Sequence, residues 1–143
     1  MPYRYIPDIA IAYVAFEAWG GTLEELFVAA ADATMNVMVA DLATVAEPLA
    51  RTIRVEDTEV DMLLFQLLQE LIFLKDAERL LLRVKAIEIR SIDGLYTLEA
   101  VARGEELDPA RHDLVVDVKA VTLHRYRVNK TPGGWEAAVI LDI

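Results

Sequence analysis

One stretch decides the fold: residues 57–72 read DTEVDMLLFQLLQELI. Their apolar members recur at helical spacing for more than three turns, which predicts an amphipathic helix that begins around Asp57–Thr58. The apolar stripe of this helix consists of Val60, Leu63, Leu64, Leu67, Leu68, Leu71 and Ile72. Such a stripe has to be buried against another layer of the fold.

A second helix is predicted upstream, after Gly20-Gly21. Thr22 and Glu25 have the spacing of a capping box, with Thr22 as the N-cap. The helix should end near Asp41, and its apolar stripe consists of Leu23, Leu26, Phe27, Ala30, Ala31, Thr34, Met35 and Met38.

The segment before this helix, residues 6–19, is almost entirely apolar. Glu17 is its only charged residue after Asp8. A strand that is apolar on both faces is usually covered on both sides, so we expect a buried strand here. A short strand is also predicted at residues 51–56, where Ile53 and Val55 alternate with polar residues.

The remainder of the chain is predicted to form strands. Between Leu80 and Arg90 the apolar residues change parity, which indicates either a β-bulge near Ala86 or the end of a strand. Asp93-Gly94 is typical of a hairpin turn. A long strand should follow, with one face formed by Leu114, Val116, Val118, Ala120, Thr122, His124 and Tyr126.

The residues 131–134, TPGG, then turn the chain into a last strand over residues 135–141. The element order is β-α-β-α-β-β-β-β. It predicts an α+β fold in which two helices pack on a largely antiparallel β-sheet. A chain of 143 residues, 55% of them hydrophobic, suits one domain over residues 1–143.

Composition narrows the function classes. The chain has no cysteine, which excludes disulfide frameworks, thiolate zinc sites and cysteine nucleophiles. The N-terminus lacks an apolar signal-peptide core. The most apolar helical stretch, residues 62–74, is too short to span a bilayer and is interrupted by Gln66, Gln69 and Glu70. We therefore expect a cytoplasmic protein that makes no contact with membranes.

The charge balance points to protein or cation partners. The chain carries 14 basic and 24 acidic residues, for a formal net charge of −10. Such a surface repels phosphate backbones, so direct nucleic-acid binding is not expected. The charge suits a basic protein partner or bound cations, and the alternative is that it serves solubility alone.

Signatures of conventional enzymes are absent from the sequence. Neither GxxxxGK[ST] nor GxGxxG occurs, and there is no GxSxG elbow. The only serine is Ser91, which argues against a serine hydrolase. We expect a protein that is not an enzyme.

The last strand leads directly to Asp142 and Ile143. Together, the Asp142 side chain and the α-carboxylate of Ile143 offer hard oxygen ligands of the kind that bind Ca²⁺ or Mg²⁺. The alternative is a final strand with an exposed aspartate. His124 is a second candidate, although a lone histidine on the apolar side of a strand is more often hydrogen-bonded in a core or at an edge. We expect His112 to be a solvated loop residue.

Five stretches of the chain together resemble the archease family, whose members assist RtcB-type tRNA-splicing RNA ligases. The resemblance rests on their order and spacing along nearly the whole chain. The stretches are residues 18–27 (AWGGTLEELF), 63–71 (LLFQLLQEL), 102–105 (ARGE) with His112, 118–124 (VKAVTLH), and the final Asp142-Ile143.

This resemblance implies a non-enzymatic accessory protein. Archease-like proteins promote guanylylation of the ligase and allow it to turn over repeatedly, and they have been linked to chaperoning of a tRNA methyltransferase. The family's metal site combines an Asp of an N-terminal His-Thr-Ala-Asp motif with the C-terminal Asp and the last residue. An acidic activator would also suit a basic, RNA-binding ligase.

Here the family's N-terminal motif is replaced by residues 10–13, AIAY. Ala10 takes the place of the motif's His, and Tyr13 that of its Asp. A phenol with a pKa of about 10 is a poor ligand for hard cations at neutral pH, and Asp8 has a different offset. The resemblance thus places Tyr13, Asp142 and Ile143 at the metal-site positions. Lys119 and His124 match a family motif and are expected to contact the partner or shape the site.

Overall fold

The structure, a computed structural model, describes residues 2–7 and 12–143. Asp8 and Ala10, which the sequence analysis considered at the metal site, lie outside these residues. The helices and strands in chain order are β1 (Tyr3–Ile6), β2 (Tyr13–Gly20), α1 (Leu23–Met38), a short 3-10 helix (Leu42–Thr44), β3 (Leu49–Asp57), α2 (Val60–Glu78), β4 (Leu80–Ile92), β5 (Leu95–Glu106), β6 (Ala120–Thr131) and β7 (Gly134–Asp142).

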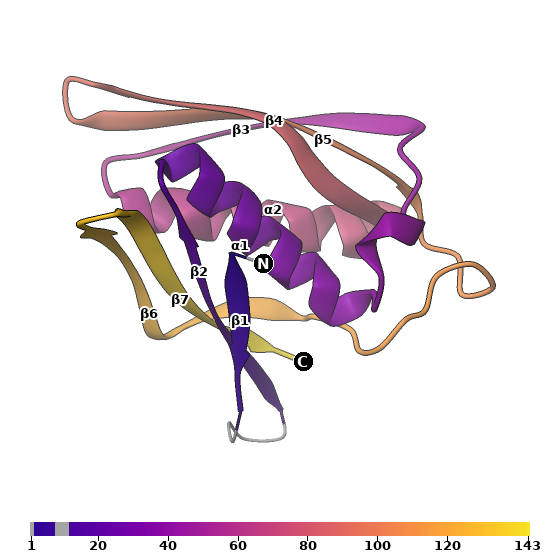
Figure 1. The fold of residues 1–143 in the computed structure, drawn as a ribbon. Coiled ribbons are helices and arrows are strands. Elements are labelled where there is room, and N and C mark those ends of the chain that lie inside the picture. Colours follow the sequence, from indigo (N-terminus) through magenta and orange to yellow (C-terminus); the bar gives the residue numbers. More distant parts are fainter. Residues whose placement is uncertain (1, 8–11) are drawn as a thin grey trace.

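The described strands form two antiparallel sheets. One has the order β1-β2-β7-β6 and the other the order β3-β5-β4. Both helices lie between the sheets, so the molecule has three layers (Figure 1). The predicted α+β fold with two helices and antiparallel strands is confirmed, but its strands divide into two sheets rather than one.

This layering explains why the helices are buried more completely than one stripe requires. Helix α1 buries its predicted stripe from Leu26 onward and also Ala29, Ala33 and Val37, because a sheet packs on each side of it, while Leu23 is half-buried. The predicted N-cap is confirmed, since the Glu25 N–H donates to Thr22 Oγ1 at 3.1 Å. Helix α2 begins three residues later than Asp57 and continues to Glu78.

The apolar segment expected to be one strand over residues 6–19 includes the last residue of β1, Ile6, and most of β2, which begins at Tyr13. Strand β1 pairs antiparallel with the middle of β2, with Tyr3 opposite Ala18 and Ile6 opposite Ala15. The prediction of a single strand was wrong because the segment's apolar run continues from one arm of this hairpin into the other.

The predictions of a β-bulge and of a hairpin turn are confirmed. The β4–β5 register shifts between Val84 and Ala86, which confirms the bulge and excludes a strand end there. Asp93 and Gly94 both have positive φ angles, 52° and 80°, in the hairpin turn between these strands. The short predicted strand at residues 51–56 lies within β3.

The prediction of a long strand from Leu114 to Tyr126 was wrong. Strand β6 begins only at Ala120, and Leu114 makes a single isolated bridge to Val39. The register of β6 against β7 also shifts between Thr122 and Arg127, so the alternation does not continue through the strand.

Neither helix in the described part of the chain has the length and apolarity needed to cross a bilayer.

Candidate functional site

The predicted site residue Asp142 ends the central strand β7, between β2 and β6. In the register, Asp142 lies opposite Tyr13 on one side and opposite Ala120 on the other. Its neighbour Leu141 belongs to the core against the helices. Because side chains alternate along a strand, Asp142 points to the outer face of this sheet, the face away from the helices. Directly opposed residues have Cβ atoms about 5 Å apart, so Tyr13 is its cross-strand neighbour there.

Backbone hydrogen bonds hold the end of β7 from both sides. The Lys119 N–H donates to Asp142 O at 2.8 Å, and the Ile143 N–H donates to Ala12 O at 2.9 Å. The Ile143 side chain is half-buried against the core. The structure therefore places Tyr13, Asp142, Ile143 and the backbone of Lys119 next to one another.

Lys119 is the last residue of a segment, residues 107–119, that crosses from β5 to β6 without regular secondary structure. The middle of this segment is hydrogen-bonded to the end of α1. The Ala40 N–H donates to Asp113 O, and the Val115 N–H donates to Met38 O, each at 2.9 Å. These bonds give the segment a defined path over the helix layer.

A buried lysine of α2 anchors the last part of this segment. Lys75 is 5% exposed, and its ammonium has three acceptors. Its Nζ donates to Asp76 Oδ1 and Asp117 Oδ1 at 2.5 Å and to Val118 O at 2.8 Å. All three N–H donors are satisfied, which is the condition for burying a charged amine. Lys75 thus fixes the two residues that precede Lys119.

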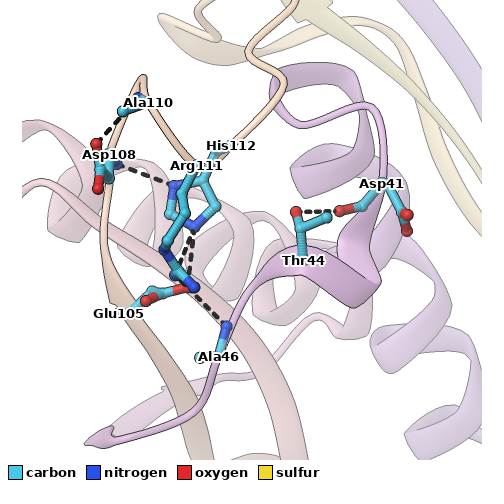
Figure 2. Close-up of polar contacts among 8 residues, drawn as sticks. All are labelled: Asp41, Thr44, Ala46, Glu105, Asp108, Ala110, Arg111 and His112. Atoms are coloured by element: carbon cyan, nitrogen blue, oxygen red, sulfur yellow. Dashed lines mark hydrogen bonds and ion pairs between the residues drawn. The ribbon is translucent and has the colours of Figure 1, made fainter.

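A histidine anchors the first part of the segment, as Figure 2 shows. The Asp108 N–H donates to His112 Nδ1 at 2.9 Å, so the ring proton resides on Nε2 and is donated to Glu105 Oε2, also at 2.9 Å. His112 is 3% exposed. The prediction that His112 is a solvated loop residue was wrong, because its ring closes the loop onto β5.

Glu105 is the hub of this cluster. Its carboxylate accepts the Ala46 N–H at 2.7 Å and forms an ion pair with Arg111 in addition to the His112 bond (Figure 2). The hydrogen bond from Ala46, followed by that from His112, holds the pKa of Glu105 below its ordinary value. The cluster ties β5, the 107–119 segment and the chain before β3 to one carboxylate.

His124 is not brought to the terminus. It lies in the irregular part of β6 between Thr122 and Arg127, and its side chain is exposed. Its backbone N–H donates to Thr122 Oγ1 at 3.3 Å. The structure thus places His124 on the surface of the edge strand, rather than on the apolar face where the sequence predicted it.

The residues described do not by themselves complete a Ca²⁺ or Mg²⁺ site. Next to Asp142 and Ile143, the family's third position, Tyr13, offers a phenol in place of a carboxylate, whereas Ca²⁺ takes six to eight oxygen ligands. No group of three or more His, Cys, Asp or Glu side chains suited to a metal occurs in the described ranges. Binding of either ion stays a prediction that titration can test.

Comparisons with known proteins assign the family. The model of the Archease protein family matches residues 3–143. The chain is 34% identical to the archease of Methanosarcina acetivorans and 35% identical to that of Pyrococcus abyssi, each over 142 residues. These alignments cover 99% of this chain and 95% and 96% of the two relatives. The chain belongs to the archease family.

Solved structures agree with this assignment. The solution structure of Methanobacterium thermoautotrophicum protein 1598 matches with a TM-score of 0.85 and 33% identity, and the match covers 99% of both chains. An archease of Thermotoga maritima, described as a possible chaperone, matches with a TM-score of 0.59 over 96% of both chains. At 16% identity, this second likeness shows the archease fold alone.

Two anchors of this archease-family site were not predicted from the sequence: Lys75 and the Glu105–His112 pair. Lys75 follows Leu71 by four residues, so a lysine on the apolar stripe of α2 was the available signal. Glu105 was noted only as part of a match to the family, and His112 was also expected to be a solvated loop residue. Their contact spans a loop, and no local periodicity indicates it.

Proposed function

We propose that this protein is an accessory factor for an RtcB-type RNA ligase, which promotes guanylylation and repeated turnover of the ligase in tRNA splicing by protein–protein contact. The observation that supports the proposal is the placement of Asp142. Asp142 is the last residue of β7 and lies opposite Tyr13, which occupies the family's Asp position. Its backbone carbonyl accepts a hydrogen bond from the Lys119 N–H.

The surroundings of Asp142 support a contact surface rather than a catalytic centre. Tyr13 is 42% exposed, and the side chain of Lys119 is also exposed. The half-buried Asp142 and the exposed Lys119, both held by backbone hydrogen bonds, can contact a partner together.

The test is a reconstitution with the ligase from the same organism. Guanylylation is measured with labelled GTP, and turnover with RNA in excess over ligase. We expect the wild-type protein to accelerate both reactions and Asp142→Asn to lose most of this effect, at least about tenfold. Asp93→Asn, at the exposed hairpin turn, is the matched control and should keep full activity. No change in guanylylation or turnover on adding wild type refutes the proposal.

Tyr13 favours a second candidate function, a metal-independent chaperone or interaction module for another RNA-modifying enzyme such as a tRNA methyltransferase. A phenol in place of the family carboxylate removes one anionic metal ligand. Calorimetric titration with Ca²⁺ and Mg²⁺ separates the candidates. We expect Tyr13→Asp to bind Ca²⁺ more tightly than wild type, because it restores a third carboxylate. Tight binding by wild type that Tyr13→Asp leaves unchanged would show that position 13 is not part of the site.

A further inference from the structure

The edge strand β6 carries positive charge in an otherwise acidic protein. Between Asp117 and Glu136 the chain has no acidic residue, and it has four basic ones, Lys119, Arg125, Arg127 and Lys130. The chain as a whole has a formal charge of −10. We call residues 123–130 of this strand the basic edge.

The two guanidinium groups of the basic edge have no acidic partner. Arg125 and Arg127 are exposed, and neither forms an ion pair within the described residues. The outer face of the other sheet differs, since Arg54 there pairs with Glu99 at 2.8 Å. Among the described residues, Arg125 and Arg127 thus differ from Arg54 in having no ion-pair partner.

The backbone of the basic edge is irregular at the same place. Arg125 has a φ of 51°, in the left-handed region that non-glycine residues rarely occupy. The register against β7 shifts across residues 122–127, and Leu123 in the shifted stretch is 59% exposed. Conformations of this kind persist where the surrounding structure imposes them, and they cluster at binding and switch sites.

The free side of β6 suits an extended chain. Strand β6 ends the order β1-β2-β7-β6, so no described strand pairs along its other side. A peptide can add to such an edge through main-chain hydrogen bonds, with side-chain contacts supplying selectivity. Exposed Leu123 between cations matches an acidic segment that also contains apolar residues.

The aromatic residues near the basic edge disfavour single-stranded RNA. Trp135 lies under the Lys130 ammonium, which is 5.9 Å from its ring centroid. Tyr126 is turned toward α2, where its hydroxyl donates to Asp61 O at 2.6 Å. Neither ring offers a free stacking surface for bases, which RNA binding along a strand uses.

We propose that the basic edge is a docking site for an acidic, extended segment of a partner protein. Arg125 and Arg127 pair with the carboxylates of that segment, and Leu123 contacts its apolar side chains. This surface is separate from Asp142, and the proposal does not depend on ligase activation.

The test is an NMR titration of the full chain with a ten-residue peptide of alternating Glu and Val. Two double variants are compared, Arg125→Gln/Arg127→Gln and, as the matched control, Arg54→Gln/Arg90→Gln. Both lower the net charge by two. We expect amide shifts confined to residues 121–131. We also expect binding weakened at least about fivefold by the first variant and less than about twofold by the second.

Several results would overturn the proposal. One is equal weakening by both variants, which would assign the effect to net charge alone. Another is the absence of shifts at the basic edge. Tighter binding of a twelve-residue oligouridine than of the peptide would make the site one for RNA. Self-association of the Arg125→Gln/Arg127→Gln variant without peptide binding by wild type would mean that the cations only protect an exposed edge.

Discussion

The two sheets of this molecule differ in the regularity of their strands and in the ion pairing of their arginines. In the β3-β5-β4 sheet, the strands are long and the described register shifts once, by a single residue at Lys85. On its outer face, Arg54 forms an ion pair with Glu99 at 2.8 Å. In the β1-β2-β7-β6 sheet, four residues of β6 fall between Thr122 and Arg127, and the cations there stay unpaired.

This difference separates a regular sheet from one with an irregular edge strand, and it is to the second sheet that we assign the proposed partner contacts. Strand pairing in the β3-β5-β4 sheet is continuous apart from the bulge at Lys85. The other sheet ends at Asp142 and is completed by the 107–119 segment, which depends on anchors from α2 and β5. Unpaired charge and irregular backbone are concentrated where a partner would bind.

The largest expected effect comes from disturbing the regular sheet at Gly104. A Cβ there would lie 1.7 Å from Leu81 O, a backbone atom that cannot move aside. We expect Gly104→Ala to lower the free energy of unfolding by about 3 kcal/mol, measured by urea denaturation. Gly133→Ala is the control, since nothing lies within 4 Å of its Cβ, and it should change stability by less than about 0.5 kcal/mol. Similar values for both variants would contradict the close packing of β5 on β4.

A smaller effect is expected from Lys75→Met, which removes the anchor of the 107–119 segment. The acids Asp76 and Asp117 are 56% and 63% exposed, so water screens most of their attraction. The main loss is the hydrogen bond from Lys75 to the Val118 carbonyl. We expect its loss to lower the free energy of unfolding by about 1–2 kcal/mol.

Hydrogen exchange followed by mass spectrometry sharpens this prediction. In Lys75→Met, exchange should rise at residues 117–119 and stay unchanged in β4 and β5. Lys85→Met is the control, because Lys85 forms a surface pair with Glu47. Uniformly faster exchange would show that Lys75 supports the whole fold rather than the segment.

The smallest effect concerns Glu105 and depends on pH. Its pKa is lowered in the folded state, so its contribution to stability is present above its ordinary pKa of 4.5 and is lost as pH falls through the folded value. The stability difference between wild type and Glu105→Gln should therefore be full at pH 6 and shrink below about pH 4.5. Chemical denaturation across this range measures it, and a difference that stays constant down to about pH 3 would contradict the prediction.

Local patterns predicted much of the fold. The capping box at Thr22, the stripe of α2, the bulge near Ala86 and the turn at Asp93-Gly94 depend on residues close in sequence, and each was found. The register that places Tyr13 opposite Asp142 agrees with the positions given by the family resemblance.

What the sequence did not predict depends on distant contacts. The alternating residues from Leu114 onward have the pattern of a strand, but hydrogen bonds to α1 and Lys75 draw residues 113–118 away from any sheet. His112 is buried by a carboxylate seven residues earlier, across a loop. The division into two sheets could not be deduced because it depends on strand pairings between distant residues, such as Tyr13 with Asp142, which local apolar spacing does not specify.

The β4–β5 hairpin has a practical use. Its turn at Asp93-Gly94 extends beyond the helix layer, away from the C-terminal end of β7 (Figure 1), and nothing lies within 4 Å of a Cβ at Gly94. Exposed turns of this kind tolerate insertions. A fluorophore or affinity tag placed there would report on complexes while leaving both Asp142 and the basic edge untouched.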